Sequence, residues 1–130
     1  IMNLELIWMT DEMMKEILGG LTQELRRGVV VLAVLSQLHE PQYGYSLVSK
    51  LAEMDFPIEA GTLYPLFRRL EKQGLLESLW DTNESRPRKY YRLSPMGKDV
   101  YDQLCEEWSQ MVISIGNLLK SEEGEKDGNS

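Results

Sequence analysis

Positive charge is concentrated in the stretch RPRKYYR, at residues 86–92, although the chain of 130 residues carries a formal net charge of −7. Between Gly61 and Lys98 there are eight lysines and arginines against four acids, a balance of +4 that leaves −11 for the rest of the chain. Cationic side chains neutralise phosphates. The asymmetry therefore predicts one face that binds a polyanion and other faces that repel it.

The residue inventory offers little for other chemistry. His39 is the one histidine and Cys105 the one cysteine, so the sequence predicts no metal site, no internal disulfide and no cofactor. It has no glycine-rich phosphate loop before a helix and no compelling carboxylate pair, so we expect no enzyme activity and no catalytic residue. It also has no apolar run of 18 residues, and its N-terminus carries acids where a secretion signal needs cations. These features predict a cytoplasmic protein without a membrane partner.

The first half of the chain predicts helices. Residues 1–9 are expected to be irregular and a short helix to begin at Thr10 or Asp11, with Gly19 and Gly20 as its break, so that 1–20 form an N-terminal arm with a short extra helix. An apolar helix is expected over 21–38, with a strand over 29–35 as the alternative, and a second helix over 45–54.

A third helix is predicted over 61–74, where apolar residues recur at helical spacing. Its buried stripe is Leu63, Leu66, Phe67 and Leu70, and its opposite side carries Thr62, Pro65, Arg68, Arg69 and Lys72. Pro65 is expected in the first turn, where a missing N–H is tolerated, and Gly74 as the stop.

Two short strands and a long helix complete the predicted order. The segments LLESLW and RKYYRLS, at 75–80 and 88–94, read as a β-hairpin. Ser94 and Pro95 are expected to start a last helix whose apolar residues alternate steps of three and four, as in a coiled-coil seam. This seam is Tyr101, Leu104, Trp108, Met111, Ile115 and Leu118. The predicted fold is mainly α with a small β-hairpin: a winged helix-turn-helix over 21–94, a C-terminal dimerisation helix over 95–120 and a disordered tail over 121–130.

Three motifs resemble the PadR family of bacterial transcriptional regulators. They are YGYSL at 43–47, GTLYPLFRRLEKQGLL at 61–76 and RPRKYYRLSPMG at 86–97. The resemblance implies a homodimeric winged-helix repressor whose C-terminal helix forms the dimer interface. The short C-terminus is similar to the smaller subgroup of the family, and Trp108 stands where multidrug-sensing members have a tryptophan facing a central pore.

This fold predicts which side chains meet double-stranded DNA. Arg86, Arg88 and Lys89 at the hairpin tip suit phosphates or the minor groove, and Tyr91 is expected to hydrogen-bond a phosphate while Tyr90 packs in the core. Side chains of the third helix are expected to contact the base edges and so to read the DNA sequence. Its candidates are Thr62, Tyr64, Pro65, Arg68 and Arg69. Tyr43 is a further candidate, with packing as its alternative role.

The function expected from these features is a homodimeric repressor on an inverted-repeat operator, with half-sites about 34–36 Å apart. A small aromatic or cationic ligand at the dimer centre is a further hypothesis, with Trp108, Met111, Val112 and Met13 as its wall. The alternatives are that Trp108 is only core and that the chain is a winged-helix protein-interaction module without effector sensing.

Overall fold

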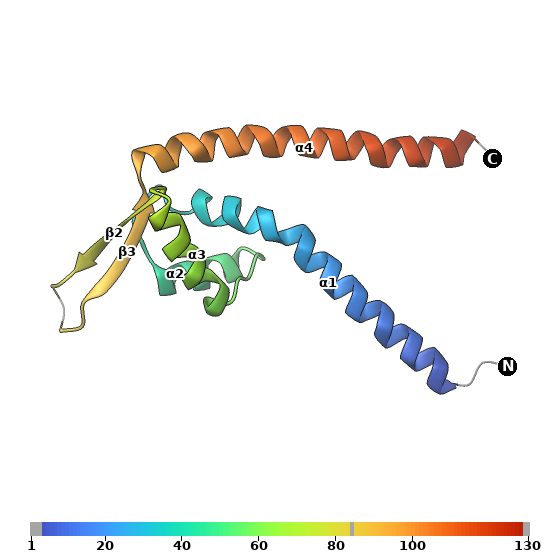
Figure 1. The fold of residues 1–130 in the computed structure, drawn as a ribbon, viewed down its shortest axis with the longest axis horizontal. Coiled ribbons are helices and arrows are strands. Elements are labelled where there is room, and N and C mark those ends of the chain that lie inside the picture. Colours follow the sequence, from blue (N-terminus) through green and yellow to red (C-terminus); the bar gives the residue numbers. More distant parts are fainter. Residues whose placement is uncertain (1–3, 84, 129–130) are drawn as a thin grey trace.

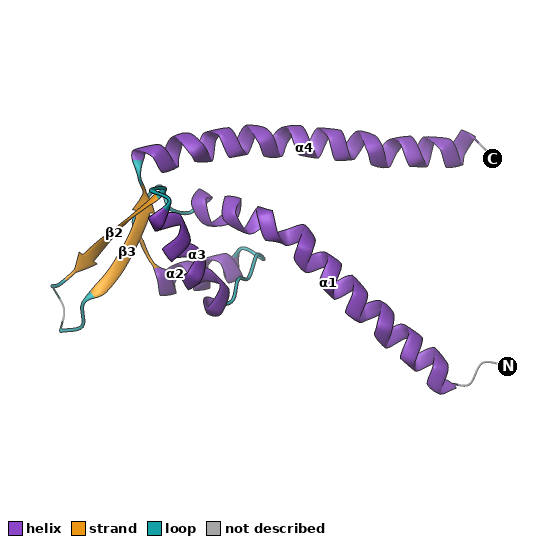
Figure 2. Cartoon of the chain, viewed as in Figure 1, coloured by secondary structure: helices purple, strands orange, loops and turns teal. Residues whose placement is uncertain are grey.

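The computed structural model describes residues 4–83 and 85–128 of the chain. Two long helices flank a small body of two shorter helices and a three-stranded sheet (Figures 1 and 2). In chain order the elements are α1 (Leu4–Ser36), β1 (Gln42–Tyr43), α2 (Gly44–Glu53), α3 (Ala60–Lys72), β2 (Leu76–Asp81), β3 (Arg88–Leu93) and α4 (Pro95–Gly128). The predicted three helices, hairpin and long last helix are therefore confirmed.

The core lies where the C-terminal end of α1, helices α2 and α3, and the base of the sheet meet. The predicted buried stripe of α3 is confirmed, because all four of its residues are buried, and Phe67 has no exposed surface. The ring of Tyr91 in β3 stacks on Phe67 with centroids 4.3 Å apart. This contact attaches the hairpin to helix α3.

The sheet is antiparallel, with strand order β1-β3-β2. The sequence predicted no strand at β1, but Gln42 pairs with Tyr91 and Tyr43 pairs with Tyr90. A two-residue strand is too short to show an alternating pattern in the sequence. Its effect is to join the start of α2 to the outer edge of the hairpin.

Helix α1 corrects the expected N-terminal organisation. It runs without interruption from Leu4 to Ser36, so the irregular arm, the break at Gly19 and Gly20 and the strand alternative are wrong for the described residues. Each glycine costs a helix about 1 kcal/mol, which the surrounding leucines, methionines and glutamates offset because they are good helix formers. Thr10 donates its hydroxyl hydrogen to the carbonyl of Leu6 at 2.9 Å, inside the helix rather than at a cap.

Helix α4 begins as predicted and ends later than predicted. Pro95 is its first residue, and the helix continues to Gly128, so the expected disordered tail is helical over 121–128. Residues 129 and 130 lie outside the described part. Glutamate and lysine, which dominate 120–126, are good helix formers even without a packing partner. No helix in the described part of the chain is both long and apolar enough to cross a bilayer.

Candidate nucleic-acid interface

The exposed side of α3 carries the side chains predicted to read bases. Thr62, Pro65, Arg68 and Arg69 are all exposed, while Tyr64 is 37% exposed and packs edge-on against Phe67 at 5.9 Å. Pro65 is the sixth residue of the helix, so the expectation that it lies in the first turn is wrong. The N–H that proline lacks would have met the carbonyl of Gly61. Both residues are on the exposed side, where water can satisfy that carbonyl.

The end of α3 is fixed by a glycine turn. Gly74 has a φ of 82°, and its N–H donates to the carbonyl of Glu71 at 3.0 Å. The N–H of Leu75 donates to the carbonyl of Leu70 at 2.9 Å. These two bonds form a Schellman motif, which confirms Gly74 as the predicted stop. The turn delivers the chain directly into β2.

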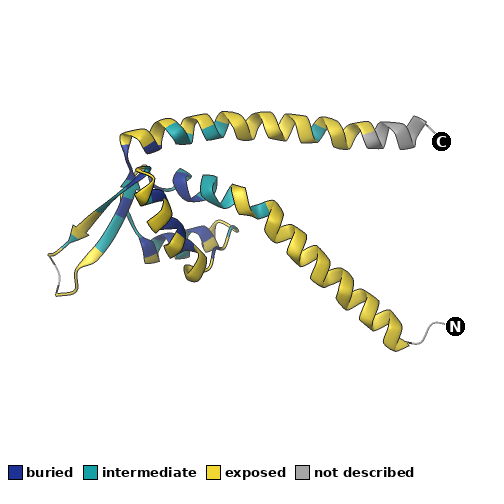
Figure 3. Ribbon diagram, in the orientation of Figure 1, coloured by how far each residue is buried: buried dark blue, intermediate teal, exposed yellow. Residues whose placement is uncertain are grey.

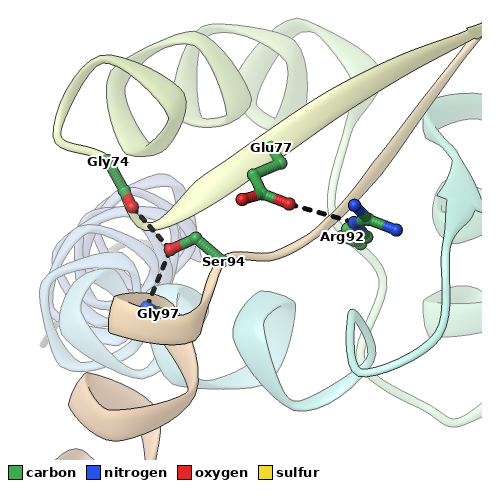
Figure 4. Close-up of polar contacts among 5 residues, drawn as sticks. All are labelled: Gly74, Glu77, Arg92, Ser94 and Gly97. Atoms are coloured by element: carbon green, nitrogen blue, oxygen red, sulfur yellow. Dashed lines mark hydrogen bonds and ion pairs between the residues drawn. The ribbon is translucent and has the colours of Figure 1, made fainter.

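Ser94 connects this turn to α4, as Figure 4 shows. Its hydroxyl donates to the carbonyl of Gly74 at 2.6 Å and accepts a hydrogen bond from the backbone N–H of Gly97 at 2.9 Å. The second bond is the N-cap expected from the sequence. Ser94 is buried, and its hydroxyl joins the end of α3 to the start of α4.

The hairpin β2–β3, called the wing from here on, has two distinct faces. Tyr91 is 5% exposed and faces the core, together with Ser78, Trp80 and Lys89, whose positions share its parity in the paired strands. Tyr90 lies on the outer face. The expected orientation of these tyrosines is therefore wrong: Tyr91 is the one that packs in the core, on Phe67, and Tyr90 is the one on the outer face.

A polar cluster occupies the outer face of the wing. The rings of Tyr43 and Tyr90 stack with centroids 3.8 Å apart, the Tyr90 hydroxyl donates to the Tyr43 hydroxyl, and the Tyr43 hydroxyl donates to Asp81 at 3.3 Å. The guanidinium of Arg88 lies 5.2 Å from the centre of the Tyr43 ring. Tyr43 therefore packs in this cluster, which was its alternative role.

Titration of this cluster follows from its hydrogen bonds. The bond to Tyr43, followed by partial burial and the nearby Asp81 carboxylate, raises the pKa of Tyr90 to about 12. The backbone N–H of Asn83, followed by the two tyrosine hydroxyls, lowers the pKa of Asp81. Both shifts favour a neutral Tyr90 hydroxyl beside an ionised Asp81 carboxylate.

The three cations predicted at the wing tip do not share one environment. Arg86 and Arg88 are exposed, as a phosphate contact requires. Lys89 instead turns towards α3, where its Nζ lies 3.5 Å from Oε2 of Glu71, and its side chain is 31% exposed. The expectation that Lys89 meets a phosphate is therefore not supported, because the strand's alternation sends it to the inner face.

Two features beside the predicted residues were missed. Trp80 is 63% exposed on the inner face of the wing, which becomes evident only once Tyr91 is known to face inward. A groove of about 900 Å³ runs along one flank of α3, and Arg26 and Arg27 of α1 line it together with Thr62, Pro65 and Arg69. Arg26 is held there by donating to the carbonyl of Pro57 at 2.9 Å.

The predicted seam of α4 divides into two parts. Tyr101 and Leu104 are partly buried against this chain's own core. Their place in a dimer interface stays a prediction. The rest of the seam is exposed, Trp108 by 44%, and Figure 3 shows this helix exposed along most of its length. The exposed seam residues are Trp108, Met111, Ile115 and Leu118, with Val112 beside them. Met13 is also exposed, in the half of α1 that diverges from α4 in Figure 1.

The fold and these exposed cations define the chain as a winged helix-turn-helix protein with a long C-terminal helix. Residues 31–103 match the model of the transcriptional regulator PadR-like family. The chain belongs to this family, as its motifs predicted.

Solved structures and a curated relative agree. A PadR family regulator from Eggerthella lenta is 50% identical, with 83% of this chain and 96% of that chain covered and a TM-score of 0.78. Bacillus subtilis PadR in complex with operator DNA has a TM-score of 0.55 at 21% identity, covering 59% of this chain and 46% of that chain, and so shares the fold. The transcriptional regulator Rv3488 of Mycobacterium tuberculosis is 34% identical over 77 residues, 58% of this chain and 72% of the relative.

Proposed function

We propose that this protein is a sequence-specific DNA-binding repressor. The observation that carries the proposal is the exposed cationic surface of α3 and the wing in an otherwise acidic chain. Arg68, Arg69 and Lys72 project from α3, and Arg86 and Arg88 project from the wing. Helix α3 is the element that enters the major groove in this fold, and the wing then meets the flanking backbone. The operator complex of B. subtilis PadR supports the same use of the shared fold.

The active species in this proposal is a homodimer. Trp108, Met111, Ile115 and Leu118 form an exposed apolar stripe on α4, and large apolar patches on soluble proteins mark interfaces. A second stripe lies on α1, where the exposed apolar residues also follow heptad spacing apart from Asp11. Its members are Leu4, Ile7, Met14, Leu18, Leu21 and Leu25. A second copy of the chain covers both stripes.

Dimer symmetry then sets the operator. Two copies related by a two-fold axis present two α3 helices, which requires an inverted repeat with half-sites about one helical turn apart. A dimer bound across a promoter excludes other proteins from it, which is the simplest route to repression.

An effector site at the dimer centre completes the proposal. Trp108, Met111 and Val112 of α4 and Met13 of α1 offer a flat aromatic surface and flexible apolar walls for a planar aromatic or cationic ligand. A ligand between the copies changes the distance between the two α3 helices and so weakens operator binding. Quenching of tryptophan fluorescence by a panel of planar cations and phenolic acids tests this step, and a panel without any saturable response contradicts it.

The experiment for the main proposal is selection of bound fragments from genomic DNA, followed by mobility shifts at physiological salt. We expect a common inverted repeat among the fragments and retarded complexes that contain two chains. Replacing Arg68 and Arg69 with alanine should abolish the selective complex, while the same change at Lys50 and Lys120, outside the cationic surface, should leave it. Failure to enrich any sequence would favour a protein-interaction module instead.

A further inference from the structure

Glu71 is an acidic side chain on α3 that contacts both strands of the wing. Its Oε1 accepts a hydrogen bond from the hydroxyl of Ser78 in β2 at 3.0 Å. Its Oε2 lies 3.5 Å from Nζ of Lys89 in β3 and is buried without a hydrogen-bond partner among the described residues. One carboxylate of α3 therefore contacts both strands of the wing.

Lys89 is surrounded on the same inner face. Its Nζ lies 5.2 Å from the ring centre of Tyr91 and 5.9 Å from that of Trp80, in addition to the Glu71 carboxylate. Arg88, the preceding residue, points to the opposite face. The alternation of β3 thus places Arg88 on the outer face of the wing and Lys89 on the inner face, where it pairs with Glu71.

Such a pair adds little to stability. Both partners are about one third exposed, and partly exposed ion pairs contribute weakly to folding. What the contacts do provide is a fixed direction for the wing, because they join α3 to β2 and to β3 at once.

We propose that Glu71 is a positioning residue that sets the angle between α3 and the wing before DNA binds, with Lys89 and Ser78 as its two anchors. The inference rests on the proposed function, since α3 and the wing must meet one duplex together. A wing that is already oriented loses less conformational freedom on binding. Lys89 then acts through geometry and not as a phosphate contact.

The test compares Glu71→Gln with Glu77→Gln. Glu77 accepts a hydrogen bond from Nε of Arg92 at 3.0 Å on the outer face (Figure 4), so its loss removes the same charge without touching α3. Amide hydrogen exchange of residues 76–81 and 88–93 is measured first on the free proteins. DNA affinity and its salt dependence are then measured on a selected operator fragment, at a temperature where both variants are fully folded. Ser78→Ala is the second variant, because it leaves the net charge unchanged.

The expected result is faster exchange in the wing of Glu71→Gln than of Glu77→Gln. Operator binding should be about 5- to 10-fold weaker, because a wing that is not held in advance loses more conformational freedom on binding. The salt slope stays that of the wild type, and Ser78→Ala shifts both readouts in the same direction. Equal wing exchange in the two glutamine variants overturns the inference, whether or not either binds DNA. Tighter binding with a steeper salt slope also overturns it, since Lys89 would then have moved to a phosphate. A wild-type protein that binds no fragment refutes the proposed function instead, and wing exchange still decides the role of Glu71.

Discussion

The buried hydroxyl of Ser94 permits the sharpest stability prediction. Ser94→Ala removes the N-cap of α4, a change that costs about 1 kcal/mol in other helices. It also removes the 2.6 Å hydrogen bond to the carbonyl of Gly74, and a hydrogen bond of this kind contributes about 0.5–1.5 kcal/mol net. Together these losses predict destabilisation by about 1.5–2.5 kcal/mol, which for a chain of this length lowers Tm by about 6–9 °C.

Urea denaturation at fixed protein concentration measures the effect. Ser94→Thr keeps the hydroxyl and should recover most of the loss. Ser36→Ala is the matched control, because Ser36 donates to the carbonyl of Ala33 at 2.6 Å but caps no helix, and we expect a loss of about 0.5 kcal/mol or less. A change below about 0.5 kcal/mol for Ser94→Ala would refute the role of this hydroxyl in joining α3 to α4.

Individual residues of the fold and the wing give three further predictions. A Cβ at Gly97 would overlap the backbone carbonyl of Leu75, so Gly97→Ala should destabilise the protein by about 2 kcal/mol or more. Gly61→Ala is the control and should not destabilise it, because a Cβ there meets open space. Thermal unfolding of the two variants measures the difference. The pKa of Tyr90 is about 12 in the folded protein against an ordinary value of 10.0. The neutral hydroxyl therefore stabilises the fold fully below pH 10, and this contribution to the free energy of unfolding is lost as the pH rises towards 12. Ultraviolet titration should show that Tyr90→Phe removes one late-ionising tyrosine, and the same change should abolish this alkaline loss of stability. Replacing Arg86 and Arg88 with glutamine should flatten the slope of log K against log salt concentration by about 0.9 for each phosphate that is no longer neutralised. Each change occurs twice per dimer. An unchanged slope would show that these arginines lie outside the interface.

The helices and hairpin were predictable where a period recurs over several turns or strand residues. The stripe of α3 repeats often enough to identify both its buried and its exposed side. Ser94-Pro95 and Gly74 mark boundaries because each supplies a specific backbone interaction. These signals are local, so the sequence alone carries them.

Other features depended on contacts that local sequence does not encode. Tyr90 and Tyr91 are equally able to pack, and only Phe67 decides which of them faces inward. The continuity of α1 through Gly19 and Gly20 reflects the helix formers on either side, which outweigh the two glycines. Lys89 belongs to a basic run in the sequence, and its pairing with Glu71 appears only when β3 is placed against α3.

The seam of α4 shows a further limit of periodicity. Tyr101 and Leu104 share the spacing of Trp108 and Met111, yet the first pair packs on its own chain and the second pair is exposed. A heptad pattern indicates that a helix face is covered without identifying the partner.

Hydroxyl-radical footprinting on a selected operator tests the central claim most directly, namely that two copies place α3 and the wing on one duplex. The account predicts two protected patches related by a two-fold axis, about one helical turn apart, with two chains per duplex. A single protected patch, or protection that is unchanged when Arg68 and Arg69 are replaced by alanine, would contradict it.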